Sequence, residues 1–174
     1  MIQENNQNFF DLKYSEILIL NRSFGKFLQE GNEYKISIIS NIVCVQINEI
    51  IEYAFRVKGI PAQVKLGDYD NIIQDSLKFN NSDLIIIFYE ISNLIEGLQY
   101  KIETFNQKKI DELILFVKAQ IDLVFINLKE AKLVLFNKFS SLLFNIENIE
   151  KSKYFLFVEQ LNSYLEEVSP LNII

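Results

Sequence analysis

The chain has 174 residues, of which 49% are hydrophobic and 13% aromatic, so it can bury one sizeable core and is too apolar for a disordered chain. Its net charge of -6 argues against nucleic-acid binding and against binding to anionic membranes, because both usually need a basic surface. It contains no histidine and one cysteine, which excludes histidine-based catalysis, an internal disulfide and a Cys/His metal site.

Cysteine usage and hydropathy predict a cytoplasmic protein. The single thiol, Cys44, fits a reducing compartment. The polar, acidic start of the chain (MIQENN) lacks the basic-then-apolar pattern of a signal peptide. The most apolar stretch, 113–128, is interrupted by Lys118, Gln120 and Asp122, so we expect a buried amphipathic helix there rather than a membrane span.

The first third of the chain predicts a helical extension followed by a strand–helix–strand unit. Apolar residues at helical spacing predict a helix over 9–29, ended by the Gly31-Asn32 pair. The β-branched run 35–40 (KISIIS) predicts a strand. Helical spacing returns over 45–58, and Gly59 and Pro61 end that helix. The run 62–66 (AQVKL) predicts the second strand.

The rest of the chain continues the alternation of helices and strands. The run 83–89 (DLIIIFY) gives the strongest strand signal, and its unbroken apolar character predicts a strand covered on both faces. The other predicted elements are a short helix at 71–79, a long helical region at 91–130 divided near 105–107, a strand at 132–136, a helix at 152–168 and the beginning of a fifth strand at 171–174.

Strands separated by helices predict a parallel sheet of four to five strands, with right-handed crossovers and helices on both faces. The expected class is therefore α/β, a three-layer sandwich. We expect an N-terminal helical extension at 1–33 and one α/β domain at 34–174.

Polar residues follow each predicted strand, at the edge where open parallel sheets bind ligands. They are Ser40, Asn41, Asp68, Tyr69, Glu90, Asn93 and Asn137. Each also has a structural explanation, since serine and asparagine cap helices and aspartate favours turns. For one residue alone we favour that explanation, but the set indicates a ligand-binding site, because a parallel sheet needs no such cluster in order to fold.

Motifs for the common chemistries are absent. The sequence has no GxGxxG, no GxxxxGKS/T, and no DxDxT/V segment of the kind that supplies an aspartyl nucleophile in phosphatases. Asp68 and Glu90 could in principle hold Mg²⁺, although two acids near a strand edge are common. Cys44 stands near a predicted helix N-terminus, which can lower a thiol pKa, but a buried structural cysteine is the favoured interpretation.

Several segments together resemble the N-terminal domain of FkbH-like proteins of the haloacid-dehalogenase-like superfamily. They are 35–41 (KISIISN), 58–60 (KGI), 64–70 (VKLGDYD) with Gln74, 82–88 (SDLIIIF), 133–137 (LVLFN) and 159–162 (EQLN). The resemblance covers about 34–174 and implies a flavodoxin-like, SGNH-hydrolase-like fold.

The resemblance also implies a larger protein. Such proteins carry a Mg²⁺-dependent catalytic domain after this one, and they handle an acyl or glyceryl unit on an acyl carrier protein in polyketide or surface-polysaccharide biosynthesis. No cofactor is expected within these residues. The expected partners are a carrier protein or the downstream catalytic domain, and the sequence suggests a fragment or a truncated gene product.

The residue-by-residue comparison with SGNH hydrolases predicts a degraded active site. Their GDS motif falls on Ile39-Ser40-Asn41, and their GxND motif falls near 90–93 without its glycine. The Asp and His of their last motif would lie beyond Ile174. The leading hypothesis is therefore a non-catalytic binding or docking domain.

Two alternatives remain open at this stage. One is an esterase-like enzyme with Ser40 as nucleophile and Asp68, Glu90 or a partner chain as the source of the base. The other is a structural or oligomerisation domain that packs through its aromatic helices. The aromatic residues concerned are Phe116, Phe125, Phe155, Phe157 and Tyr164.

Overall fold

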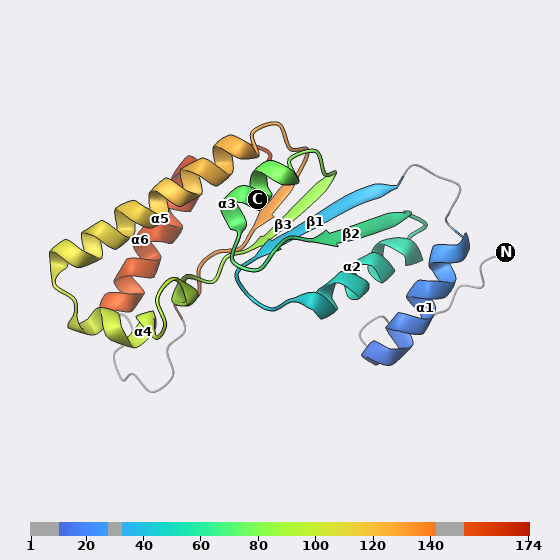
Figure 1. Ribbon diagram of the computed structural model, residues 1–174, viewed down its shortest axis with the longest axis horizontal. Coiled ribbons are helices and arrows are strands. Elements are labelled where there is room, and N and C mark those ends of the chain that lie inside the picture. The colour runs from blue at the N-terminus through green and yellow to red at the C-terminus, as the bar shows by residue number, and fades with distance from the viewer. Residues whose placement is uncertain (1–10, 28–32, 142–151) are drawn as a thin grey trace.

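A four-stranded parallel sheet forms the centre of the computed structural model, which describes residues 11–27, 33–141 and 152–174. The strand order is β2-β1-β3-β4 (Figure 1). The strands are β1 (Tyr34–Ser40), β2 (Ala62–Leu66), β3 (Leu84–Phe88) and β4 (Val134–Phe136). All four predicted strands are confirmed to within two residues, and every pairing between them is parallel.

Helices cover both faces of this sheet, so the three-layer sandwich is confirmed (Figure 1). Successive side chains of a strand point to opposite faces. Ile38 therefore belongs to the core beneath α2 (Val45–Val57), whereas its neighbour Ile39 belongs to the larger core on the other face. The helices of that second face are α3 (Ile72–Lys78), α5 (Gln107–Asn127) and α6 (Lys153–Val168).

The long helical region divides where the sequence predicted. It consists of η2 (Ile91–Leu94), α4 (Leu98–Lys101), η3 (Ile102–Thr104) and then α5. The side chain of Asn106 accepts a hydrogen bond from the backbone N–H of Lys109 at 3.0 Å and so caps the first turn of α5.

A fifth strand begins beside β4, as the sequence predicted for 171–174. The Val134 N–H donates to the carbonyl of Asn172 at 2.8 Å, and the Ile174 N–H donates to the carbonyl of Val134 at 2.9 Å. Val134 and Ile173 form a parallel bridge. The order β2-β1-β3-β4 followed by this segment is that of flavodoxin-like folds.

The prediction that β3 is covered on both faces is confirmed for one face and, on the other, only at Leu84, which is 5% exposed. Ile85 and Ile87 are fully buried among the helices of the larger core. Ile86 and Phe88 point to the other face and are only half-buried. The reason is that α2 packs on β2, which lies at the opposite edge of the sheet from β4. This position leaves β3 less covered on that face.

The N-terminal helix α1 (Tyr14–Phe27) packs against α2, on the side of α2 away from the sheet (Figure 1). This confirms the helix predicted at 9–29 over residues 14–27, although the described residues 11–13 precede the helix rather than belong to it. The stop signal at Gly31-Asn32 lies outside the described residues. Asn21 is 1% exposed and donates to the carboxylates of Glu49 (2.7 Å) and Glu52 (3.1 Å). The division of the chain at residue 33 stays a prediction.

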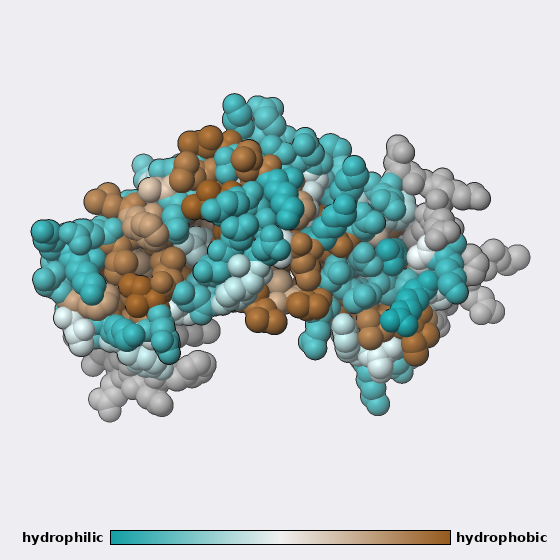
Figure 2. All heavy atoms as spheres, viewed as in Figure 1, coloured by the Kyte–Doolittle hydropathy of each residue, from teal (hydrophilic) through white to brown (hydrophobic). Residues whose placement is uncertain are grey.

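Two of the five aromatic residues suggested for oligomerisation belong to the core instead. Phe125 and Phe157 are buried between α5, α6 and the sheet. Phe116 is 53% exposed. Figure 2 shows brown, hydrophobic residues along α5, with smaller brown groups elsewhere on this face of the molecule. In the described ranges, no helix has the length and apolar character needed to cross a bilayer.

Candidate functional site

Asn41 and Glu90 meet at the carboxyl edge of the sheet, immediately after β1 and β3. Asn41 is 1% exposed, and its Oδ1 accepts the Glu90 N–H at 2.7 Å while its Nδ2 donates to the Glu90 carbonyl at 2.9 Å. The Nδ2 of Asn93 donates to the Asn41 carbonyl at 2.8 Å. Asn41, Glu90 and Asn93, three of the predicted residues, are therefore brought together. The Asn41 side chain supplies the backbone of Glu90 with the hydrogen bonds that a neighbouring strand would otherwise make.

Asn137 does the same on the other side of β3. Its Oδ1 accepts the Tyr89 N–H at 2.6 Å, and its Nδ2 donates to the carbonyls of Tyr89 (3.2 Å) and Lys138 (2.9 Å). Because β1 and β4 flank β3, the two asparagines hold residues 89–90 from both sides. Asn41 and Asn137 thus position the loop after β3 and have their amide groups already engaged.

Ser40 lacks the surroundings of a nucleophile. Its hydroxyl donates to the Ile42 carbonyl at 2.8 Å and lies 3.1 Å from the Cys44 sulfur. Neither partner is a base, and within the described part of the chain no carboxylate is hydrogen-bonded to this hydroxyl. Activation of a serine requires a base within hydrogen-bond reach. The N-cap explanation for Ser40 and Asn41 is also wrong, because α2 begins after Cys44 and no side chain caps it.

The other predicted residues serve local structure or lie on the surface. The Glu90 carboxylate accepts the Ser92 N–H at 3.0 Å and so caps η2. The Asp68 side chain is 77% exposed and lies 3.7 Å from the Lys78 ammonium group. Tyr69 is 65% exposed in the same loop. No hydrogen bond of the described residues joins the side chain of Asp68 or Tyr69 to the asparagine network.

A cavity of about 320 Å³ opens beside this network, between the loop after β2, α3, η2 and α5. Its apolar walls include Leu94, Phe116 and Val124. Its polar lining comes from Asp70, Gln74, Tyr89, Asn93 and Gln120. Asn93 is the one predicted site residue that lines it.

Four polar residues of the cavity were therefore missed as site residues. Gln74 was noted only in the family resemblance, and Tyr89 only as a strand end. Gln120 had a usable signal, since it is one of four polar residues in the apolar stretch 113–128. An uncharged polar residue in an apolar helix face indicates either a buried hydrogen bond or a cavity wall.

Tyr89 and Gln120, which both line the cavity, are hydrogen-bonded to each other through their side chains. The buried Tyr89 hydroxyl donates to Oε1 of Gln120. Burial raises the pKa of Tyr89 well above its usual value, and the negative charge of Asp70 raises it further. Tyr89 is therefore a neutral phenol that acts as a hydrogen-bond donor.

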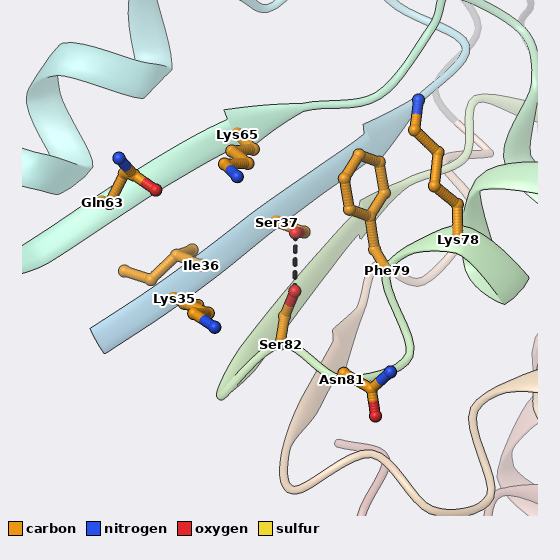
Figure 3. Close-up of a pocket in the computed structure, with 9 residues that line it drawn as sticks. All are labelled: Lys35, Ile36, Ser37, Gln63, Lys65, Lys78, Phe79, Asn81 and Ser82. Atoms are coloured by element: carbon orange, nitrogen blue, oxygen red, sulfur yellow. Dashed lines mark hydrogen bonds between the residues drawn. The ribbon is translucent and has the colours of Figure 1, made fainter. Parts of the chain in front are cut away.

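A second, smaller cavity of about 210 Å³ lies at the amino ends of the strands (Figure 3). Lys35 and Lys65 project from β1 and β2 around it, and the hydroxyls of Ser37 and Ser82 are hydrogen-bonded at 2.7 Å. Ligands of open α/β sheets bind at the opposite, carboxyl edge. The cavity beside Asn93 is therefore the candidate site.

The described residues do not fit a magnesium site. Residues 11–27, 33–141 and 152–174 contain no group of three or more Cys, Asp or Glu side chains that could hold a metal ion. Of the suggested pair, Asp68 faces Lys78 and Glu90 caps η2. No chemical step through Mg²⁺ follows for this domain.

The fold is shared with a solved structure, the crystal structure of the N-terminal part of the protein BF1531 from Bacteroides fragilis, which contains a phosphatase domain complexed with Mg. The two superpose with a TM-score of 0.69 at 14% sequence identity, over 94% of this chain and 44% of that one. At this identity the likeness shows the fold alone, and the chain spans less than half of the solved one. No protein-family model matches the sequence, and neither does any curated protein.

Proposed function

We propose that this chain is a non-catalytic, SGNH-like binding or docking domain of an FkbH-like protein. It handles an acyl or glyceryl unit, or the carrier protein that bears it, in polyketide or surface-polysaccharide biosynthesis. The observation that carries the proposal is the cavity at the carboxyl edge of the sheet, which is lined by hydrogen-bonding groups but holds no nucleophile–base pair.

Support for binding without catalysis comes from the side chains that an SGNH hydrolase would use. Ser40 donates its hydroxyl proton to a backbone carbonyl, and the amide of Asn41 holds the Glu90 backbone. Both groups are therefore engaged in keeping the loops in place. Asn93 keeps one amide oxygen for a ligand, because only its Nδ2 is bound to Asn41.

Support for the family comes from two independent sources. The segments that resemble FkbH-like proteins include β1, the loop after β2, and β3, which together form the edge of the candidate site. The solved neighbour has the same fold within a chain that contains a phosphatase domain. On this proposal a catalytic domain acts beside the present one, and Mg²⁺ binds there.

The test is calorimetric titration of the full chain with an acyl carrier protein bearing a glyceryl thioester. Asn41 is unsuitable for substitution because its loss would disturb the loops. The informative variant is instead Asn93→Ala combined with Gln120→Ala, and Gln46→Ala on the exposed side of α2 is the control. We expect the double variant to weaken binding by about tenfold or more, the loss of one or two well-placed hydrogen bonds, and the control to change nothing.

Two results would contradict the proposal. One is that neither the loaded carrier protein nor a free acyl or glyceryl ligand binds the chain. The other is hydrolysis of a generic acyl ester by the purified chain that disappears in Ser40→Ala, since this would make Ser40 a nucleophile.

A further inference from the structure

The cavity beside β3 has a lining whose only charge is negative. Asp70 is its only charged lining residue, and no lysine or arginine lines it. A phosphate or carboxylate in this space would meet a carboxylate and no cation. Anion sites in proteins use Arg, Lys or clustered backbone N–H groups, so this lining selects against anions.

The cavity offers both hydrogen-bond donors and hydrogen-bond acceptors to a ligand. Asn93 uses Nδ2 for the Asn41 carbonyl, which leaves its Oδ1 as an acceptor, and the Asp70 carboxylate is a second acceptor. Gln120 accepts from Tyr89 through Oε1, which leaves its Nε2 as a donor. Among the described residues no hydrogen bond engages these three remaining groups. A hydroxyl group can satisfy either kind, because it donates and accepts.

Asp70 is held in place for this role. It has a φ of 57°, a left-handed conformation that aspartate adopts more readily than most residues, and its N–H donates to the Ser40 carbonyl at 3.1 Å. The loop after β2 is thereby attached to the end of β1. The negative charge of Asp70 also raises the pKa of the Tyr89 hydroxyl, and both residues line the cavity.

The size and the apolar walls limit the ligand further. About 320 Å³ is at the lower end of small-molecule pockets. Phe116 and Leu94 offer flat and aliphatic surface for C–H groups. A short chain or single ring with several hydroxyls matches both the polar and the apolar parts of the lining.

We infer that the cavity binds a neutral, polyhydroxylated carbon chain or ring, such as the glyceryl end of a loaded carrier or a free sugar, and that it rejects the phosphorylated form of the same ligand. This inference rests on the proposed function, because it names the ligand class of the same site. Its consequence is that a hydroxylated ligand carrying a phosphate must lose that phosphate before this domain holds it.

The experiment uses the full, ¹⁵N-labelled chain and follows the backbone and side-chain amide resonances. The ligands are glycerol and D-glucose, their phosphates glycerol 3-phosphate and glucose 6-phosphate, and ethanolamine as a small cation. We expect the neutral ligands to shift the Asn93 and Gln120 side-chain amides saturably. We expect the phosphates to bind about tenfold or more weakly, since they face an uncompensated like charge.

Asp70→Asn separates charge from shape. It removes the charge and one of the acceptor oxygens, so it should weaken binding of the neutral ligands and at the same time reduce the ratio by which they bind more tightly than their phosphates, while the exposed control Glu130→Gln leaves both the affinity and the ratio unchanged. If glycerol binds and a glyceryl-loaded carrier protein competes with it, the glyceryl end is the source of the hydroxyls. If glucose binds and the carrier protein does not compete, the source is a free sugar.

Several results overturn the inference and leave the proposed function standing. These are phosphates that bind as tightly as the neutral ligands, ethanolamine that binds more tightly than glycerol, or carrier-protein binding without any shift of the cavity resonances. The absence of binding by every small ligand and by the carrier protein overturns both.

Discussion

At the scale of single residues, the turn after β2 depends on Gly67 for space. A Cβ atom at Gly67 would lie 2.3 Å from Oδ2 of Asp75, a distance that no real contact allows. The same Oδ2 accepts the Asp68 N–H at 2.6 Å, and Asp75 is buried, so it cannot simply swing into solvent. The glycine and the carboxylate therefore form one unit that shapes the loop leading to Asp70.

We predict that Gly67→Ala lowers the free energy of unfolding by about 1–3 kcal/mol, the usual range for overpacking a tight site. In combination with Asp75→Ala the two effects should be strongly non-additive, because the second change removes the atom with which the first collides. Urea unfolding followed by circular dichroism measures all four forms.

Gly59 provides the control for that experiment. It has a φ of 78° with no atom near an added Cβ, so Gly59→Ala should be destabilising through backbone strain alone and additive with Asp75→Ala. Additive effects at Gly67 and Asp75 would show that the collision does not set the cost.

At the scale of elements, a polar network joins α1 to α2 and β2. Arg56 donates to Oδ1 of Asn21 at 2.8 Å and to the carbonyl of Ala62 at 3.0 Å, and it lies 3.1 Å from a carboxylate oxygen of Glu52. Glu52 also accepts the N–H of Val64 at 3.0 Å. The buried Asn21 is the contribution of α1 to this network.

We predict that Asn21→Ala destabilises the protein by roughly 1–3 kcal/mol, because Glu49, Glu52 and Arg56 lose a buried partner. Amide hydrogen exchange should rise first in α1, since that helix packs mainly on α2. The exposed neighbour Arg22 gives the matched control, Arg22→Ala. Unchanged exchange in α1 would mean that apolar contacts such as Phe24 with Tyr53, 6.1 Å between ring centroids, hold it alone.

At the scale of the whole molecule, a buried tyrosine makes the free energy of unfolding fall as the pH becomes alkaline. Tyr154 is 2% exposed, and burial, together with the charge of Glu90, raises its pKa to about 12. The unfolded chain has a tyrosine pKa of about 10. The contribution of Tyr154 is therefore fully present below about pH 10 and is lost as the pH rises towards 12, because the unfolded state then releases the proton first.

We predict that the wild-type protein loses about 2–3 kcal/mol of stability through this group over that range, and that Tyr154→Phe removes this share of the loss. Tyr89 and Tyr164 shift in the same direction, so part of the pH dependence remains. Urea midpoints at pH 8 and pH 11 give the comparison, and about half of that loss is expected by pH 11. Tyr100→Phe, at a 58% exposed position, should behave as the wild type. Equal pH dependence in Tyr154→Phe and wild type would contradict the prediction.

The architecture was accessible from the sequence because its signals are local. The apolar run of β3, the break at Asn106 and the Gly59–Pro61 stop each lie within a few residues of the element that they define. The alternation of strands and helices then leaves few topologies, since crossovers are right-handed. The coverage of β3 was misjudged because a run of apolar residues does not show which helix lies over which face.

The candidate site was accessible only in part, because a strand-end rule predicts positions and not directions. The rule named Asn41, Asn93 and Asn137, and only Asn93 lines the cavity. Asn41 and Asn137 proved to hold the backbone of residues 89–90. Gln120 faces the cavity from the middle of α5, which no rule about strand ends could select.

The sequence by itself determined the composition limits, the α/β class and the order of the elements, because hydrophobic period and turn residues act over a few positions. Only the tertiary structure decided which polar groups are engaged and which remain for a ligand. Hydrogen bonds such as those of Asn41 with Glu90 and of Tyr89 with Gln120 join residues 49 and 31 positions apart. Such pairs form only when the packed sheet and helices bring the donor and acceptor atoms within about 3 Å of each other.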